Sequence, residues 1–281
     1  MKRKTLIFLA LLLLLPALEG CLHVEDLPAM TENSTIKSYY ATENYVYAAD
    51  HAAAMPSILT SLSPAYLRLV NKTHALSRED APTEVVTLPV SLTNYEKEVA
   101  LEARTATALQ AMLREMAAVG IYPKVTSGYR TYAYQESLFY GYLEAERSTI
   151  TSEARAFLGE EYIYQNYTSR GKTSLSAEDA RRVVLSYSAY PGTSEHQTGL
   201  CVDFVAFDGA PLDTSFASSD AFRWLSQNAH KFGFVLRFPS DKTAITGYSY
   251  EPWHYRFVGR EAATDIYRNG LCLEEYLGKT N

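Results

Sequence analysis

Residues 200–207 form an apolar run interrupted only by one aspartate, and this run limits the fold of the chain more than any other segment. The run reads Leu-Cys-Val-Asp-Phe-Val-Ala-Phe, and its aspartate is Asp203. An apolar run rich in Val and Phe predicts a β-strand that is buried on both faces. Because a carboxylate is costly to bury unless it is paired or bound to a metal ion, Asp203 requires a cationic partner.

Two of the six histidines lie where they could share such a cation with Asp203. His196 precedes the run by a Gly-containing turn, and His254 lies in the later segment Glu251-Pro-Trp-His254. Two imidazoles and one carboxylate leave the fourth position of a tetrahedral zinc ion open. Glu251 is then a carboxylate that can take a proton from water at that site. The two segments therefore predict a hydrolytic zinc site.

The spacing of these residues resembles that of the zinc D-alanyl-D-alanine carboxypeptidases of the VanY type, which are related to the D-Ala-D-Ala dipeptidases and to the hedgehog fold. The resemblance extends from about Ser63 to Leu277. Other segments that agree with this family are Leu69-Val70-Asn71-Lys72 with His74 and Leu76, Ser127-Gly128-Tyr129-Arg130 with Gln135, Gly233-Phe234-Val235-Leu236-Arg237, and Leu271-Cys272-Leu273-Glu274-Glu275-Tyr276-Leu277.

The resemblance implies a role for each residue that matches the family pattern. His196, Asp203 and His254 are expected to ligate Zn²⁺, and Glu251 is expected to be the catalytic base. Arg130 is expected to bind the substrate, since a planar guanidinium suits the terminal carboxylate of a peptide.

Ser127 and Gln135 are expected to lie beside Arg130 and to form hydrogen bonds at the substrate site. The implied function is zinc-dependent removal of the C-terminal D-alanine from peptidoglycan stem peptides. Three alternatives remain open: an L,D-carboxypeptidase acting on tetrapeptide stems, a cell-wall endopeptidase, and a wall-binding protein without catalytic activity.

The N-terminal residues predict an exported protein. Residues 1–20 have a basic start and a short apolar core that ends near a proline, as in a signal peptide. Residues 21–62 are interpreted as a tether, and residues 63–281 as the zinc carboxypeptidase domain. The segment Leu18-Glu19-Gly20-Cys21 resembles a bacterial lipobox, which predicts lipidation of Cys21.

This interpretation places the protein at the outer face of the bacterial cytoplasmic membrane. The alternatives are an uncleaved signal anchor or ordinary signal cleavage and secretion. The formal charge of −6 provides no basic surface for nucleic acid. We expect a monomer whose partners are the stem peptide and the membrane.

Cys201 and Cys272 are an even pair if Cys21 carries lipid. They could form a disulfide outside the cell, or they could be two buried thiols. The second interpretation is favoured, because Cys201 lies within the apolar run.

The remaining patterns predict an α+β domain with a small, largely antiparallel sheet flanked by helices. Thr93 and Glu96 form a capping-box pattern that predicts the start of a helix ending at Gly120. Further helices are expected over residues 132–147, from Ser176 onward and up to Gly233, and short strands over residues 124–126, 234–238 and 253–257.

Overall fold

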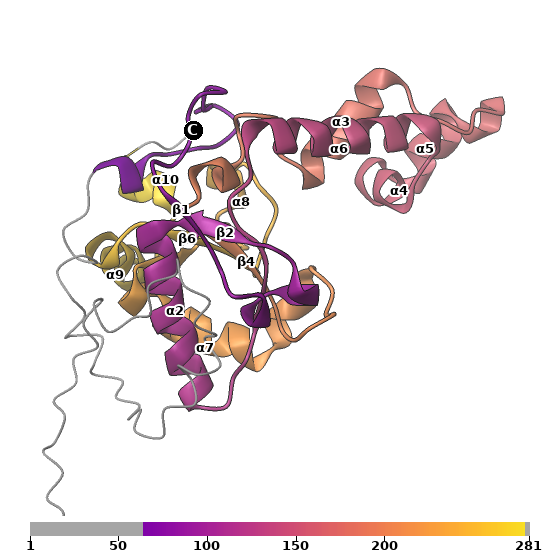
Figure 1. Ribbon diagram of the computed structural model, residues 1–281. Coiled ribbons are helices and arrows are strands. Elements are labelled where there is room, and N and C mark those ends of the chain that lie inside the picture. Colours follow the sequence, from indigo (N-terminus) through magenta and orange to yellow (C-terminus); the bar gives the residue numbers. More distant parts are fainter. Residues whose placement is uncertain (1–63, 279–281) are drawn as a thin grey trace, which may run out of the picture.

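The structure is a computed structural model that describes residues 64–278. At its centre lies an antiparallel sheet of four strands in the order β3-β4-β6-β5 (Figure 1). These strands are β3 (Lys124–Ser127), β4 (Cys201–Val205), β5 (Phe234–Leu236) and β6 (His254–Phe257). A second, two-stranded sheet pairs β1 (Val85–Thr87) with β2 (Ala100–Glu102).

Helices flank both sheets. The α-helices are α2 (Ala103–Ala118), α3 (Tyr132–Ser148), α4 (Ser152–Leu158), α5 (Glu160–Asn166), α6 (Ala177–Tyr187), α7 (Asp220–Asn228), α8 (Thr243–Thr246), α9 (Arg260–Asn269) and α10 (Leu273–Tyr276). Among residues 64–278, none of the helices is both long and apolar enough to cross a membrane. The predicted α+β class with a small antiparallel sheet is confirmed.

The two faces of β4 have different surroundings. All five of its residues are buried, as the apolar run predicted. Val202 and Phe204 point into the main hydrophobic core, where they are joined by Leu109 of α2 and Leu225 of α7. Because side chains alternate along a strand, Asp203 faces the opposite side of the sheet. That opposite side carries the candidate site.

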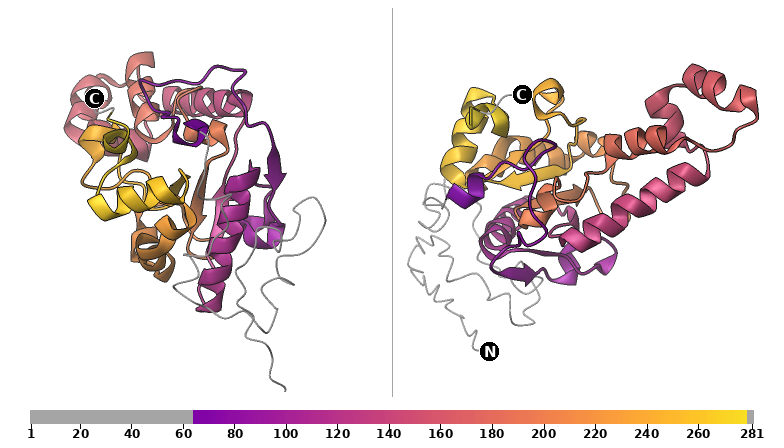
Figure 2. Two further views of the ribbon diagram at one scale, coloured as in Figure 1. Left: turned by 90° about the vertical axis from the view of Figure 1, so that its left-hand side faces the viewer. Right: turned by 90° about the horizontal axis from the view of Figure 1, so that it is seen from above.

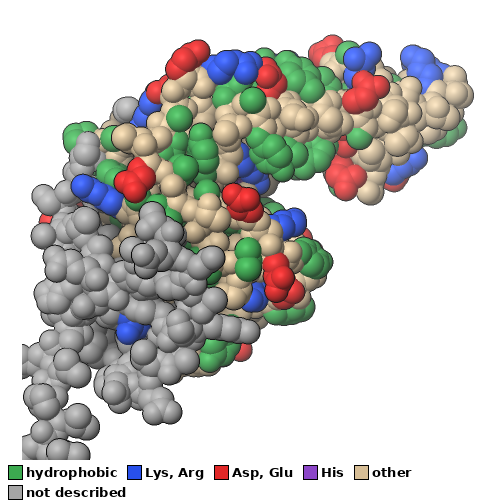
Figure 3. Space-filling view, viewed as in Figure 1, with side chains coloured by type: hydrophobic (Ala, Val, Ile, Leu, Met, Phe, Trp, Pro, Cys, Tyr) green, Lys and Arg blue, Asp and Glu red, His purple; other side chains and the backbone are tan. Residues whose placement is uncertain are grey.

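Helices α3 to α6 form an arm that projects from the body of the molecule (Figures 1 and 2). The arm has a small core of its own, made of Ala154, Ile163, Tyr167, Leu175, Ala180 and Val183. The surface of the arm mixes hydrophobic and charged side chains (Figure 3). Its junction with the body lies next to the candidate site.

The helix predicted from the Thr93 capping box was placed too early. Thr93 instead donates its hydroxyl to the carbonyls of Val90 and Lys97, and Tyr95 has a left-handed backbone (φ 55°). Residues 100–102 are taken up by β2, so the helix cannot begin before Ala103. Its N-cap is Glu102, whose side chain accepts a hydrogen bond from the backbone N–H of Thr105.

Several other sequence predictions have clear outcomes. α3 and β3 lie where they were expected. The helix expected to end at Gly233 is α7 followed by a separate 3₁₀ turn, and Gly233 adopts the positive φ of 85° that ends this turn. Cys201 and Cys272 are buried free thiols, as favoured. The predicted signal segment (1–20), the tether (21–62) and Cys21 lie outside the described residues.

Candidate metal centre

The register of the central sheet brings three of the predicted site residues into one row. On adjacent strands, Ser127 of β3 pairs with Asp203 of β4, and Asp203 pairs with His254 of β6. A bulge in β3 between Val125 and Ser127 adjusts the register there. Main-chain pairing therefore positions these side chains next to one another.

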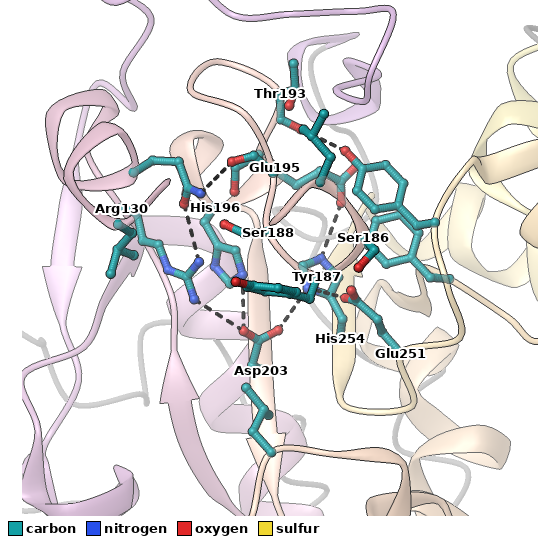
Figure 4. A pocket seen from close by; sticks show the side chains of 18 of the residues that line it. Arg130, Ser186, Tyr187, Ser188, Thr193, Glu195, His196, Asp203, Glu251 and His254 are labelled. Atoms are coloured by element: carbon teal, nitrogen blue, oxygen red, sulfur yellow. Dashed lines mark hydrogen bonds and ion pairs between the residues drawn. The ribbon is translucent and has the colours of Figure 1, made fainter. Parts of the chain in front are cut away.

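The carboxylate of Asp203 lies between two imidazole rings (Figure 4). Asp203 Oδ1 is 2.8 Å from His254 Nδ1, and Asp203 Oδ2 is 3.1 Å from His196 Nε2. All three side chains are almost fully buried. The sequence predicted that these residues lie together, and the structure brings them together.

The ring of His196 is fixed by a main-chain acceptor. His196 Nδ1 lies 2.7 Å from the carbonyl oxygen of Gly128, which can only accept a hydrogen bond. The proton of a neutral ring is therefore on Nδ1, and Nε2 is free to act as a ligand on the side of Asp203. There is no space for a side chain at Gly128, because a Cβ at this position would lie 2.4 Å from the carbonyl oxygen of Ala100.

Three donor atoms converge at this point: His196 Nε2, His254 Nδ1 and a carboxylate oxygen of Asp203. A set of two imidazoles and one carboxylate suits a zinc ion that keeps one position open. The residues present therefore fit the predicted zinc ion.

Cys201 is a further donor that the sequence prediction did not include. It lies two residues before Asp203 on the same strand face, and its sulfur and one ring nitrogen each of His196 and His254 lie within 4.8 Å of one another. Residues i and i+2 of a strand lie on the same face, so the predicted strand already placed Cys201 beside Asp203. The carboxylate of Asp203 contacts both ring nitrogens directly, which favours Asp203 over Cys201 as the third ligand.

The electrostatics of the cluster favour ionised groups. Burial opposes ionisation of Asp203, but His196 and His254 outweigh this effect and hold its pKa well below the usual range. Burial and the charge of Arg130 lower the pKa of His196, whereas Cys201 and Asp203 raise it, and the net result is about 9. Without a metal ion, the cluster therefore retains protons on its histidines.

Glu251 lies at the edge of the cluster, just before β6. Its Oε2 is 3.8 Å from His254 Nδ1, and its side chain is 23% exposed. The backbone N–H of Glu251 donates to the carbonyl of Phe238, which fixes the loop. Burial raises the pKa of Glu251. His254 lowers this pKa and Asp203 raises it, both by less than burial does. A carboxyl group in this setting suits proton transfer.

Arg130 lies on the opposite side of the cluster from Glu251 (Figure 4). Its Nη2 donates to Ser127 Oγ at 2.7 Å and lies 3.8 Å from Asp203 Oδ2. Its Nη1 donates to Gln135 Oε1 at 3.4 Å, and the side chain remains 25% exposed. Ser127 and Gln135 therefore contact Arg130 itself, and their predicted contact with a substrate stays a prediction.

The cavity at this site has a volume of about 340 Å³, a size that suits a small ligand or a peptide end, and it is lined by Arg130, Gln135, His196, Asp203, Glu251 and His254. The near end of the arm forms part of its wall. The arm residues that line the cavity are Gln135, Leu138 and Tyr142 of α3 and Leu185, Ser186 and Tyr187 of α6.

A second charged cluster lies directly behind the site, and the sequence analysis missed it. Glu195 Oε1 accepts hydrogen bonds from Arg237 Nε at 2.8 Å and from Arg256 Nη1 at 2.7 Å. Arg237 also binds both carboxylate oxygens of Glu274. All four side chains are buried. The available signal was an arginine directly after β5 and another within β6, because buried guanidinium groups require acidic partners.

Comparison with known proteins agrees with this geometry. Residues 98–260 match the model of the VanY family, described as D-alanyl-D-alanine carboxypeptidase. A curated D-alanyl-D-alanine carboxypeptidase of Enterococcus faecalis is 41% identical over 186 residues, which are 66% of this chain and 58% of that protein. The chain therefore spans less than two thirds of that relative.

Two solved structures are also similar. The LD-carboxypeptidase LdcB has a TM-score of 0.61 and 32% identity, over 79% of this chain and 90% of that chain. A mutant of the vancomycin-resistance D,D-pentapeptidase VanY, solved in complex with Zn(II), has a TM-score of 0.55 and 36% identity, over 76% of this chain and 99% of that chain.

Proposed function

Since this chain belongs to the VanY family of D-alanyl-D-alanine carboxypeptidases, we propose that it removes the terminal D-alanine from peptidoglycan stem peptides in a zinc-dependent reaction. The arrangement of Arg130 and Glu251 on opposite sides of the cluster formed by His196, Asp203 and His254 is the main support. Such an arrangement can bind a peptide end on one side of the scissile bond and transfer a proton on the other. The VanY relative in complex with Zn(II) supports the choice of metal.

His196, Asp203 and His254 would hold the zinc ion through the donor atoms that converge in the cavity. When bound, zinc supplies a Lewis acid that polarises a carbonyl group and lowers the pKa of water toward neutrality. Asp203 also balances the charge of this buried site, because its own pKa is held low.

Glu251 would take a proton from the attacking water and then pass it to the amine of the departing residue. This role requires a carboxylate within reach of the reacting atoms, and Glu251 lines the same cavity as His254. A single group that first accepts and then donates the proton needs no second acid.

Arg130 would bind the terminal carboxylate of the substrate and so determine the position of the cut. Ser127 and Gln135 accept hydrogen bonds from its guanidinium, which limits the rotamer freedom that binding would otherwise remove. A carboxylate accepts two parallel hydrogen bonds from a guanidinium, and an internal peptide bond cannot. This contact favours an exopeptidase over an endopeptidase.

An L,D-carboxypeptidase that acts on tetrapeptide stems is the second candidate. The similarity to LdcB favours it, and the same catalytic groups would serve both substrates. A wall-binding protein without activity is less consistent with a carboxylate at position 251.

Incubation of the zinc-loaded protein with purified muropeptides, followed by mass spectrometry, tests the proposal. Release of one alanine from pentapeptide stems supports the D,D activity, and loss of the terminal residue from tetrapeptide stems alone supports the L,D activity. Products shortened by more than one residue would contradict both and identify an endopeptidase. Intact stems in the presence of bound zinc would leave the wall-binding protein as the explanation.

We also propose that the N-terminal segment exports the protein and that lipid on Cys21 tethers it to the outer face of the membrane. The basic and apolar pattern of residues 1–20 supports export. Fractionation of cells that express the Cys21→Ala variant separates the alternatives. A membrane-bound wild type with a released variant supports the lipid anchor, and retention of both in the membrane supports an uncleaved signal anchor. Release of both into the medium supports ordinary signal cleavage. The expected monomer is tested by the molar mass of the purified domain in solution.

A further inference from the structure

Two buried polar atoms behind the metal site lack hydrogen-bond partners within residues 64–278. One is Glu195 Oε2 and the other is His254 Nε2. They lie 3.6 Å apart, and their side chains are 2% and 5% exposed. A buried polar atom without a hydrogen-bond partner destabilises the fold, so a hydrogen bond between these two atoms is favoured.

The carboxylate of Glu195 is held firmly in place by its other oxygen. Glu195 Oε1 accepts from Arg237 Nε and from Arg256 Nη1, at 2.8 Å and 2.7 Å. Arg256 is itself anchored, because its Nη2 donates to the carbonyls of Tyr66 and Arg68. The free oxygen of Glu195 therefore has little freedom to move away from the imidazole.

His254 presents its two ring nitrogens to different partners. Nδ1 faces Asp203 at 2.8 Å, on the side of the candidate metal site, and Nε2 faces Glu195. A neutral imidazole carries one proton. If that proton is on Nε2, the lone pair of Nδ1 points toward the metal site.

We propose that Glu195 is a positioning residue whose free oxygen accepts a hydrogen bond from His254 Nε2–H and so directs Nδ1 to the metal ion. This inference rests on the zinc site of the proposed function. A carboxylate behind a histidine ligand fixes the ring and increases its basicity. His196 is held by the neutral carbonyl of Gly128 instead, so the two rings are oriented by acceptors of different strength.

The Glu195→Gln variant tests the proposal most sharply. The two arginines require the single amide oxygen of glutamine, so its NH₂ group faces His254 Nε2. An NH₂ group only donates, which favours the tautomer with the proton on Nδ1, the wrong nitrogen for the metal. Zinc affinity, measured by competition with a chelator, should fall roughly tenfold to a hundredfold.

Glu274→Gln is the matched control. Glu274 is as buried as Glu195 and pairs with the same Arg237, but Arg237 separates it from His254. Its variant should therefore weaken the charged cluster and lower the melting temperature, while zinc affinity stays near that of the wild type. If both variants lost zinc affinity equally, the loss would come from disruption of the whole buried charged cluster and not from the contact between Glu195 and His254. That result would overturn the proposal.

A tautomer measurement keeps the proposal testable even if Glu195→Gln does not fold. Long-range ¹H–¹⁵N spectra of the wild-type protein with labelled histidine should show His254 protonated at Nε2 and, with zinc, unprotonated at Nδ1. A proton on Nδ1 in the zinc-bound protein would overturn the proposal, as would unchanged zinc affinity in a folded Glu195→Gln variant. If the wild type binds no zinc, the proposed function fails separately. The same spectra, recorded at a pH where the metal-free His254 ring is neutral, still decide the role of Glu195, because the single proton must then be on Nε2.

Discussion

Asp203 and His254 are direct neighbours across β4 and β6, and Asp203 Oδ1 lies 2.8 Å from His254 Nδ1. Two of the three expected zinc ligands are therefore positioned by the register of a buried sheet rather than by loops. Groups on strands keep their geometry better than groups on loops do. Replacement of one ligand should consequently leave the position of the other unchanged.

The first prediction concerns the choice of the third ligand. Asp203→Ala should abolish stoichiometric zinc measured by elemental analysis, whereas Cys201→Ala should retain it, because the carboxylate contacts both imidazoles directly. His230→Ala is a control, since that ring stacks on Tyr267 instead. Zinc retained by Asp203→Ala and lost by Cys201→Ala would show that the sulfur is the ligand.

The second prediction separates proton transfer from metal binding. Glu251→Gln should keep zinc and the fold, but turnover should fall about 10²–10⁴-fold, the usual contribution of a positioned acid or base. Steady-state kinetics and elemental analysis on the same sample provide both measurements. Glu261→Gln, on the exposed surface of α9, is the control. Normal turnover in Glu251→Gln would mean that another group activates the water.

The third prediction concerns pH. In the metal-free protein, burial and Arg130 lower the pKa of His196, but Cys201 and Asp203 raise it to about 9. Zinc binds only an unprotonated ring nitrogen, so a proton must leave at any pH below this value. The pKa of His254 is raised as well, so zinc affinity should increase as the pH rises toward 9. Dissociation constants measured with a chelator at several pH values test this, and a flat profile below pH 9 would contradict it.

The fourth prediction links the tight packing at Gly128 to the site. A Cβ there would lie 2.4 Å from the carbonyl oxygen of Ala100, so Gly128→Ala forces the backbone to shift. Overpacking of this kind costs about 1–3 kcal/mol in the free energy of unfolding, which denaturant titration can measure. Zinc affinity should fall as well, because the Gly128 carbonyl orients His196.

Gly141→Ala is the matched control for this substitution. Gly141 lies within α3, and a Cβ there meets nothing within 4 Å. Alanine has a higher helix propensity than glycine. The free energy of unfolding of this variant should therefore equal that of the wild type or exceed it by up to about 1 kcal/mol. A Gly128→Ala variant as stable as Gly141→Ala would show that the packing around Gly128 is easily relaxed.

The sequence was most informative where a residue conflicts with its local pattern. Asp203 interrupts an apolar run, so its burial and its need for a partner follow from the sequence alone. Glu195 was missed because it lies in a polar stretch, where an acidic residue is expected. Its burial depends on Arg237 and Arg256, which are 42 and 61 residues away in the sequence.

The misplaced start of α2 has a similar cause. Thr93 and Glu96 satisfy the local pattern of a helix cap, but the pairing of β2 with β1 takes residues 100–102 into a sheet. This pairing involves residues that are distant in the sequence, and a local pattern does not detect it. The same limit applies to the arm: α3 and α6 were predicted individually, whereas α4, α5 and the projection of the arm from the body were not.

The proposed function requires that the cavity receive a free peptide terminus, which Arg130 would hold beside the zinc site. Arg130 Nη2 lies 3.8 Å from Asp203 Oδ2, so its guanidinium is close enough to hold the terminal residue at the cluster. Arg130→Lys should be much less active than wild type, because an ammonium group cannot provide the two parallel hydrogen bonds. Arg155→Lys, on the surface of the arm, is the control.

The most direct measurement compares a pentapeptide stem that has a free C-terminus with the same stem amidated, in the presence of zinc-loaded protein. Mass spectrometry should show release of a single D-alanine from the free peptide and almost no cleavage of the amidated one. Equal cleavage of both peptides would contradict the account, because the site would then not require a terminal carboxylate.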